Sequence, residues 1–93
     1  MNSDESIVYK VRGDRVAWRI SGDETVLLDT GRSVYFALDR CATSLWPHLV
    51  AGATAAQLAE VLAGQAAVQR DRAAADVRSF LADLEAADLL ERI

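Results

Sequence analysis

The hydrophobic periodicity of this chain changes at Asp39, and this change limits the folds available to it more than any other feature. Before Asp39, apolar and polar residues alternate over short runs separated by turns, which is typical of half-buried strands. After Asp39, apolar residues recur every three or four positions, which is typical of amphipathic helices. Because strands and helices are segregated along the chain, the pattern predicts an α+β domain.

Three strands are predicted in the alternating part, at residues 16–20, 25–29 and 33–38. The turns between them contain Gly22 and Gly31, and we expect a positive φ at Gly31 because glycine adopts this conformation without steric cost. The strands then form an antiparallel meander. Residues 7–11 also alternate, so the sheet has three strands, or four if this run joins it.

A first helix is predicted after the strands, and it has two alternative starting points. Asp39 can accept hydrogen bonds from the free amides of a first turn. Pro47 lacks an amide hydrogen and clashes with the preceding turn, so the helix either kinks there or begins later, capped by Thr43 or Ser44. Gly52 is expected to end it.

Two further helices complete the predicted order. The second begins with a capping box of Thr54 and Gln57, and we expect Gly64 to close it. The third covers about residues 69–87, with one apolar stripe formed by Val77, Phe80, Leu81 and Leu84. The residues Leu89, Leu90 and Ile93 are expected to pack back as a short tail.

The composition bounds the class of protein. The 93 residues, 52% of them hydrophobic, fit a single domain over 1–93. A net charge of −4 argues against a nucleic-acid partner, because phosphate-binding proteins need a positive field. One cysteine, Cys41, permits no intrachain disulfide, and no signal peptide or membrane span is evident, so we expect a cytoplasmic protein without a membrane partner.

The sequence predicts no catalytic or metal site and no cofactor. Cys41 and His48 are the one candidate nucleophile–base pair, but on an unbroken helix they lie about 10.5 Å apart along the axis, beyond hydrogen-bond reach. The carboxylates of the last helix are expected to form a solvated face. Phosphate loops, nucleophile elbows and zinc-binding patterns are not found, so the chain is predicted not to be an enzyme.

The strand at residues 33–38 carries the strongest functional signal derived from the residues. It has no charge or proline to blunt its edge, so it can accept a peptide as an added strand, unless residues 7–11 cover that edge. Asp76, Phe80 and Asp83 form a second wall on the last helix, giving an acidic rim suited to apolar anchors and a basic residue. The aromatic residues Trp18, Phe36, Trp46 and Phe80 are expected in the core, and Tyr35 on the outer face.

The order and spacing of several short motifs resemble a known family. The motifs are a G-x-x-x-Y-x-x-L of Gly31, Tyr35 and Leu38, then Ala42, Trp46, Leu49 and Gly52, then Asp76, Val77, Phe80 and Leu81. In this order they resemble the PqqD-like recognition elements of ribosomally synthesised and post-translationally modified peptides (RiPPs). Within that family, the chain is most similar to the free-standing leader-binding proteins of lasso-peptide biosynthesis.

This resemblance implies a non-catalytic, winged-helix-like domain that binds the leader of a precursor peptide. In such proteins the leader adds as an antiparallel strand to the third strand of the sheet and lies against the third helix. The peptide-binding residues implied here are Ser33, Val34, Tyr35, Phe36 and Ala37 on the strand, and Asp76, Val77, Phe80, Leu81 and Asp83 on the helix. The bound leader is then presented to a separate cysteine peptidase, ahead of an ATP-dependent macrocyclase.

Three alternatives remain open at this point. A winged-helix DNA-binding protein has similar helices and a similar sheet, although the acidic balance argues against it. A PqqD-type chaperone would bind a peptide for a radical SAM enzyme. A homodimer would bury the strand edge against its own copy.

Overall fold

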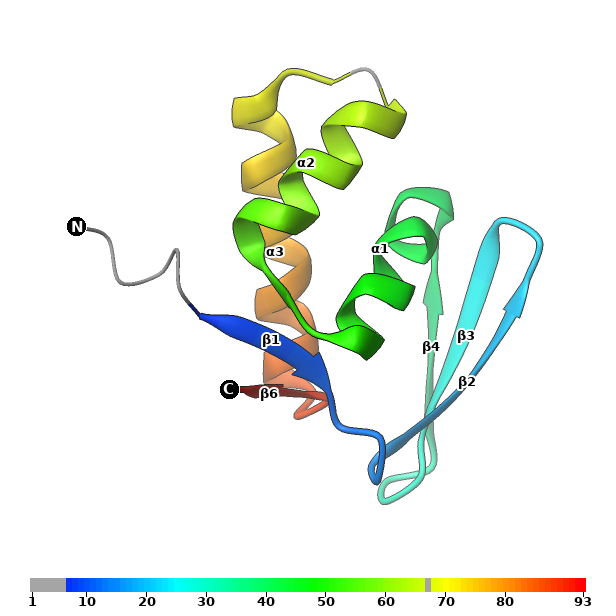
Figure 1. The fold of residues 1–93 in the computed structure, drawn as a ribbon. Coiled ribbons are helices and arrows are strands. Elements are labelled where there is room, and N and C mark those ends of the chain that lie inside the picture. The colour runs from blue at the N-terminus through cyan, green and yellow to red at the C-terminus, as the bar shows by residue number, and fades with distance from the viewer. Residues whose placement is uncertain (1–6, 67) are drawn as a thin grey trace.

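The computed structural model describes residues 7–66 and 68–93, and it has the predicted α+β order (Figure 1). The strands β1 to β4 come first, followed by three helices. One short strand lies between the first two helices, and another follows the third. The elements are β1 (Val8–Val11), β2 (Val16–Ser21), β3 (Glu24–Asp29), β4 (Val34–Leu38), α1 (Arg40–Ala51), β5 (Ala53–Thr54), α2 (Ala55–Ala66), α3 (Arg70–Ala86) and β6 (Leu90–Arg92).

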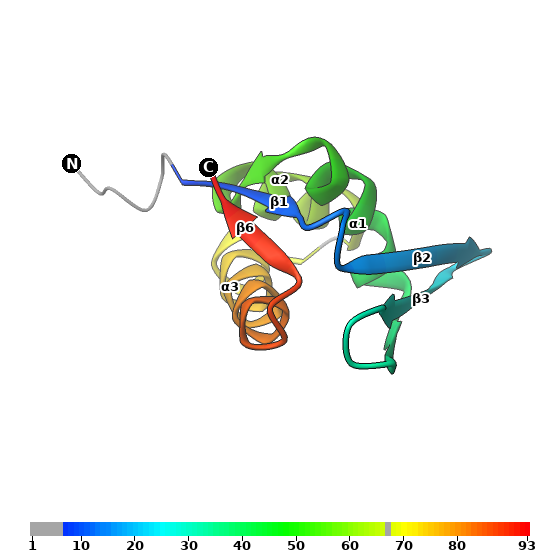
Figure 2. The ribbon, with the colours of Figure 1, turned by 90° about the horizontal axis from the view of Figure 1, so that it is seen from below.

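The strands form two separate antiparallel sheets. One is the predicted meander in the order β2-β3-β4, and it extends away from the helices (Figure 2). The other has the order β5-β1-β6, with Tyr9 of β1 opposite Ala53 on one side and Arg92 on the other. The meander therefore has three strands, and β1 does not join it.

The turn from β3 to β4 differs from our expectation. Gly31 does not have a positive φ, and Ser33 adopts that conformation instead, with φ 57°. The cause is the buried Asp29, whose Oδ1 accepts the amide hydrogens of Gly31 and Arg32 at 3.0 and 3.2 Å. Its backbone carbonyl accepts the Ser33 amide hydrogen at 2.8 Å, so the reversal of the chain falls on Ser33.

The first helix begins at the earlier of the two predicted positions. The Asp39 carboxylate accepts the Ala42 amide hydrogen at 2.9 Å, so Thr43 and Ser44 lie inside the helix and do not cap it. Pro47 is exposed and lies within α1, which continues through it to Ala51. Gly52 ends the helix with φ 102°, as predicted.

The later elements confirm most of the predicted boundaries. Thr54 and Gln57 form the capping box through reciprocal hydrogen bonds of 2.9 and 3.1 Å. The prediction for Gly64 was wrong, because α2 continues past it to Ala66. The tail forms β6 and buries Leu89 and Leu90, but Ile93 is exposed.

The core is formed by the inner faces of the helices, β1 and the inner face of the meander. Trp46 of α1 is 0% exposed, while Phe36 and Phe80 are half-buried against the core. Trp18 is exposed, contrary to expectation. It lies on β2, at the free edge of the meander, and packs edge-to-face on Trp46, with 5.6 Å between the ring centroids.

The pair of Glu85 and Arg92 makes stability depend on pH. Arg92 donates two hydrogen bonds to the Glu85 carboxylate, at 2.7 and 3.0 Å, and this interaction lowers the pKa of Glu85 below 4.5 despite partial burial. The stabilisation is therefore present above pH 4.5 and is lost as the pH falls through the lowered pKa. We expect Arg92→Gln to reduce the free energy of unfolding by less than about 1 kcal/mol at neutral pH.

Urea unfolding at about pH 7 and pH 3 checks this prediction. The carboxylate part of the difference between variant and wild type should shrink at the lower pH, as the pH falls toward and through the lowered pKa of Glu85. Arg92 also lies over the Tyr9 ring, 5.5 Å from its centroid, and that contact involves no carboxylate. An equal difference at both pH values would contradict a role for Glu85.

Candidate peptide-binding groove

One edge of β4 is open. In the part of the chain that the structure describes, β4 pairs with β3 on one side and with no strand on the other. The possibility that residues 7–11 cover this edge is excluded, because β1 pairs with β5 and β6. A free strand edge presents unpaired N–H and C=O groups to a further strand.

The register shows which backbone groups of β4 are unpaired. Ser21 and Glu24 close a two-residue hairpin, so this pair exchanges hydrogen bonds. Because antiparallel pairs alternate, the backbone groups of Leu27 point toward β4 and meet those of its partner Phe36. The N–H and C=O groups of Tyr35 and Ala37 therefore point away from β3, toward the open edge.

The side chains of β4 alternate as predicted. Phe36 and Leu38 turn toward the helices and are half-buried and buried, respectively. Tyr35 points to the outer face of the meander and is 69% exposed. The side chains of Phe36 and Leu38 thus anchor β4 to the core, while the backbone N–H and C=O groups of Tyr35 and Ala37 stay available for hydrogen bonds to a further strand.

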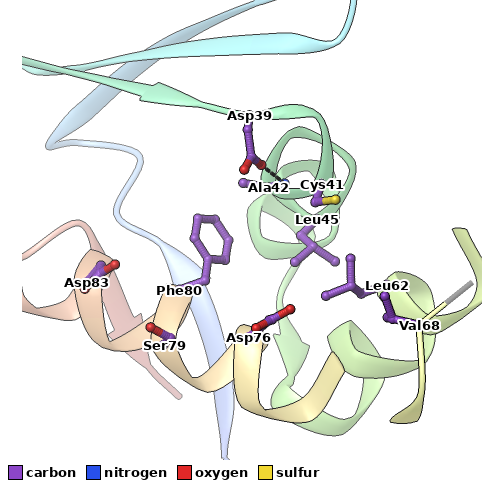
Figure 3. A pocket seen from close by; sticks show the side chains of 10 residues that line it. All are labelled: Asp39, Cys41, Ala42, Leu45, Leu62, Val68, Asp76, Ser79, Phe80 and Asp83. Carbon is purple, nitrogen blue, oxygen red and sulfur yellow. Dashed lines mark hydrogen bonds between the residues drawn. The ribbon is translucent and has the colours of Figure 1, made fainter. Parts of the chain in front are cut away.

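A continuous groove runs beside this edge, between β4, α1 and α3. Its first part has a volume of about 300 Å³ and is lined by Phe36, Ala37, Leu38, Asp39, Ala42, Phe80, Asp83 and Leu84. Its second part, of about 350 Å³, is lined by Asp39, Cys41, Ala42, Leu45, Leu62, Val68, Asp76, Ser79, Phe80 and Asp83 (Figure 3). The parts share Asp39, Ala42, Phe80 and Asp83, and the Phe80 ring points into the groove.

The structure brings together some of the predicted site residues and separates others. Phe36, Ala37, Asp76, Phe80 and Asp83 line the groove. Ser33, Val34 and Tyr35 lie on or just before β4, outside both parts of the groove. Val77 and Leu81 are 1% and 3% exposed. These two belong to the stripe of α3 that faces the core, where they lie outside both parts of the groove, and a contact between them and a peptide stays a prediction.

Sequence reasoning missed the wall contributed by the other helices. Cys41, Ala42 and Leu45 of α1 line the second part of the groove, as do Leu62 and Val68. A signal for the first three was present, because a helix capped by Asp39 directly after the strand must place its first turn beside the end of that strand. Nothing in the sequence indicated Leu62 or Val68.

The groove has an apolar floor and an acidic rim. The carboxylates of Asp39, Asp76 and Asp83 surround Phe80, and no lysine or arginine of the described chain lines either part. Asp39 is engaged in capping α1, and Asp76 lies 4.0 Å from Arg72. Within the described ranges, no group of His, Cys, Asp or Glu residues could hold a metal ion. Such a surface fits a peptide with apolar and basic side chains.

None of the helices within residues 7–66 and 68–93 has both the length and the hydropathy needed to cross a membrane.

The chain was compared with known families, curated proteins and solved structures. No curated protein matches the chain significantly. A solved structure, TbiB1 in complex with the TbiA(beta) leader peptide, superposes with a TM-score of 0.80 at 30% sequence identity, covering 88% of this chain and 94% of TbiB1. Residues 24–90, from β3 to the start of β6, match the family described as coenzyme PQQ synthesis protein D (PqqD). The chain, with its meander, its three helices and its open strand beside α3, therefore belongs to the PqqD family.

Proposed function

We propose that this chain binds the leader segment of a ribosomally made precursor peptide by adding it as an antiparallel strand to β4. The observation that carries the proposal is the open backbone edge of β4, which runs along an apolar groove. The similarity to TbiB1, whose structure contains a leader peptide, supports it. Tyr35 and Ala37 supply main-chain hydrogen bonds, while the groove receives alternate side chains of the peptide.

The energetics of such a complex are favourable. Two or three apolar anchors at roughly 1.5–3 kcal/mol each, together with strand hydrogen bonds of about 1 kcal/mol each, exceed the cost of ordering a short peptide. Phe80 and Leu45 provide apolar contact surface in the groove. Affinities from nanomolar to micromolar are expected.

We propose that the chain recognises the leader peptide without catalysing a reaction, and that it acts as a single domain in the cytoplasm. The groove contains one thiol, Cys41, and no histidine among its lining residues to activate it. A separate peptidase would remove the leader, and a macrocyclase would act afterwards in a lasso-peptide pathway. Resemblance to lasso-peptide leader-binding proteins and the likeness to TbiB1 support this assignment.

The proposal is tested by selecting peptides from a random display library on the immobilised protein. The TbiA(beta) leader peptide serves as a further probe. The selected peptides are then titrated into isotope-labelled protein. We expect amide shifts and slowed hydrogen exchange at Tyr35 and Ala37, and shifts along α3. Failure to select any peptide, or selected peptides that leave these amides unchanged, would overturn the proposal.

Phe80→Ala tests the groove itself. The half-buried ring lines both parts of the groove, so its loss should weaken binding of a selected peptide about tenfold, or about 1.4 kcal/mol. Isothermal titration calorimetry measures the change. Val26→Ala is the matched control, because Val26 is an exposed apolar residue on the outer face of the meander. Equal affinities for Phe80→Ala and wild type would remove the groove from the binding site.

A second candidate is a PqqD-type chaperone that carries a peptide to a radical SAM enzyme. The match to the PqqD family favours it as a related function with another client. Both candidates use the same groove, so peptide binding does not separate them. Reconstitution with purified enzymes separates them: with this chain present, a precursor that contains the selected peptide should be cleaved by a leader peptidase in the first case, or modified by a radical SAM enzyme in the second.

A further inference from the structure

We propose that the open edge of β4 is flanked by acidic side chains at one end and by basic side chains at the other, and that this polarity selects both the charge pattern and the direction of the client peptide. The client would carry a Lys or Arg on the N-terminal side of its paired segment and an Asp or Glu on the C-terminal side. This inference rests on the proposed function, because it concerns a peptide added to β4.

The acidic end lies where β4 passes into α1. Asp39 follows the last residue of β4, and Asp76 and Asp83 face it across the groove from α3 (Figure 3). Asp83 makes no ion pair with any described residue, and Asp76 has one exposed neighbour, Arg72, at 4.0 Å. Arg40 follows Asp39 but lines an adjoining pocket, outside both parts of the groove. A cation placed beside Phe80 would therefore meet carboxylates with little competing positive charge inside the groove.

The basic end lies where β4 begins. Arg32 immediately precedes Ser33, and its side chain is 56% exposed. Arg15 lies at the same turn, because its carbonyl accepts the Thr30 amide hydrogen at 2.9 Å. Its guanidinium is already paired with Asp88 at 3.0 Å, so Arg32 is the residue that would meet the peptide. Asp29, the carboxylate of this turn, is buried, and its Oδ1 accepts two amide hydrogens. Its Oδ2 lies 4.0 Å from the Arg32 Nε, a long contact that leaves the exposed part of the Arg32 side chain open to a peptide carboxylate.

The orientation of the client follows from these two ends. The strand β4 runs from the basic turn toward the acidic end, from Val34 to Leu38. A peptide that pairs antiparallel to it runs in the opposite direction, so its N-terminal part lies near Asp39 and its C-terminal part leaves near Arg32. A parallel peptide would require the reverse order of charges. The charges therefore favour one direction, in addition to the backbone hydrogen bonds, which exist in both.

The test compares peptide selections on the wild type and on charge variants, using a random library of about 16 residues. On the wild type, we expect Lys or Arg to be enriched before the apolar anchors and Asp or Glu after them. The double variant Asp76→Asn/Asp83→Asn should lose the basic enrichment and keep the anchors. Arg32→Gln should lose the acidic enrichment. Asp71→Asn is the matched control, since Asp71 lies on α3 but lines neither part of the groove.

The affinities of selected peptides for the wild type and for the charge variants measure the contribution of each ion pair. Each lost ion pair should weaken a selected peptide about two- to fivefold at low salt, and the difference should shrink as salt screens the charges. Selected peptides that protect the amides of Tyr35 and Ala37 but show no charge preference would overturn this inference and leave the proposed function standing. The reverse order of charges would also overturn it. If no peptide is selected, the proposed function fails, and this inference fails with it.

Discussion

Replacing Ala37 with proline is expected to weaken peptide binding about a hundredfold, or about 2.8 kcal/mol, while leaving the fold intact. The Ala37 N–H points to the open edge of β4, so proline removes a hydrogen bond to the incoming peptide and none to β3. The proline ring also occupies the space where the added strand would approach. Phe36, the preceding residue, is already extended, as a residue before proline must be.

The opposite edge of the same sheet supplies the control. Arg19 and Ser21 of β2 exchange hydrogen bonds with β3, so the N–H of Ile20 points outward from the free edge of β2. Ile20→Pro should therefore leave peptide binding unchanged. Calorimetry measures affinity, and urea unfolding shows whether both variants stay folded. Unchanged affinity in Ala37→Pro, or an equal loss in both variants, would show that the peptide does not pair with β4.

Replacing Trp46 with alanine is expected to reduce the free energy of unfolding by about 3–5 kcal/mol. Trp46 is fully buried on α1, where it packs against Trp18 of the meander. This contact is one of those that hold the meander to the helices, so its removal also leaves a cavity between the two parts of the fold. Against a total stability of roughly 5–15 kcal/mol this is a large fraction, and the urea midpoint of the variant is expected to fall accordingly.

Trp46→Phe separates the ring from its polar group. The indole Nε1 is buried and has no hydrogen-bond partner among the described residues, so it carries an unmet desolvation cost. Phenylalanine removes that cost and keeps most of the ring, and we expect a loss of less than about 1.5 kcal/mol. Urea unfolding of both variants checks the comparison. Similar losses in Trp46→Phe and Trp46→Ala would contradict the assignment of the stabilisation to the ring rather than to the indole N–H.

The sequence predicted the parts of the fold that depend on local patterns. Alternation identified the strands of the meander, and the cap of Asp39 and the capping box of Thr54 and Gln57 identified two helix starts. The partners of β1 were not predictable from periodicity. Alternation shows that residues 7–11 form a strand, but the choice of β5 and β6 as neighbours depends on contacts between residues far apart in the chain.

The part of the candidate site that depends on local helical spacing was also predictable from the sequence. The helical spacing of Asp76, Phe80 and Asp83 placed them on one edge of α3, and all three line the groove. Val77 and Leu81 were assigned to the site through family resemblance, although their spacing puts them on the buried stripe. The positive φ at Ser33 was not predicted, because the conformational freedom of glycine pointed to Gly31. The conformation of this turn depends instead on the buried Asp29 side chain, which accepts the Gly31 amide hydrogen.

The central position of β1 in the smaller sheet has a consequence for joining this domain to other proteins. The Ile93 amide donates a hydrogen bond to the Val8 carbonyl at 2.8 Å, so β1 begins where β6 ends. Helix α1 lies between this sheet and β4 (Figures 1 and 2). A chain attached before β1 or after β6 would thus start about one strand spacing, ~4.8 Å, from the other attachment point. The domain could be inserted into a surface loop of an enzyme with short linkers, and its groove would remain accessible.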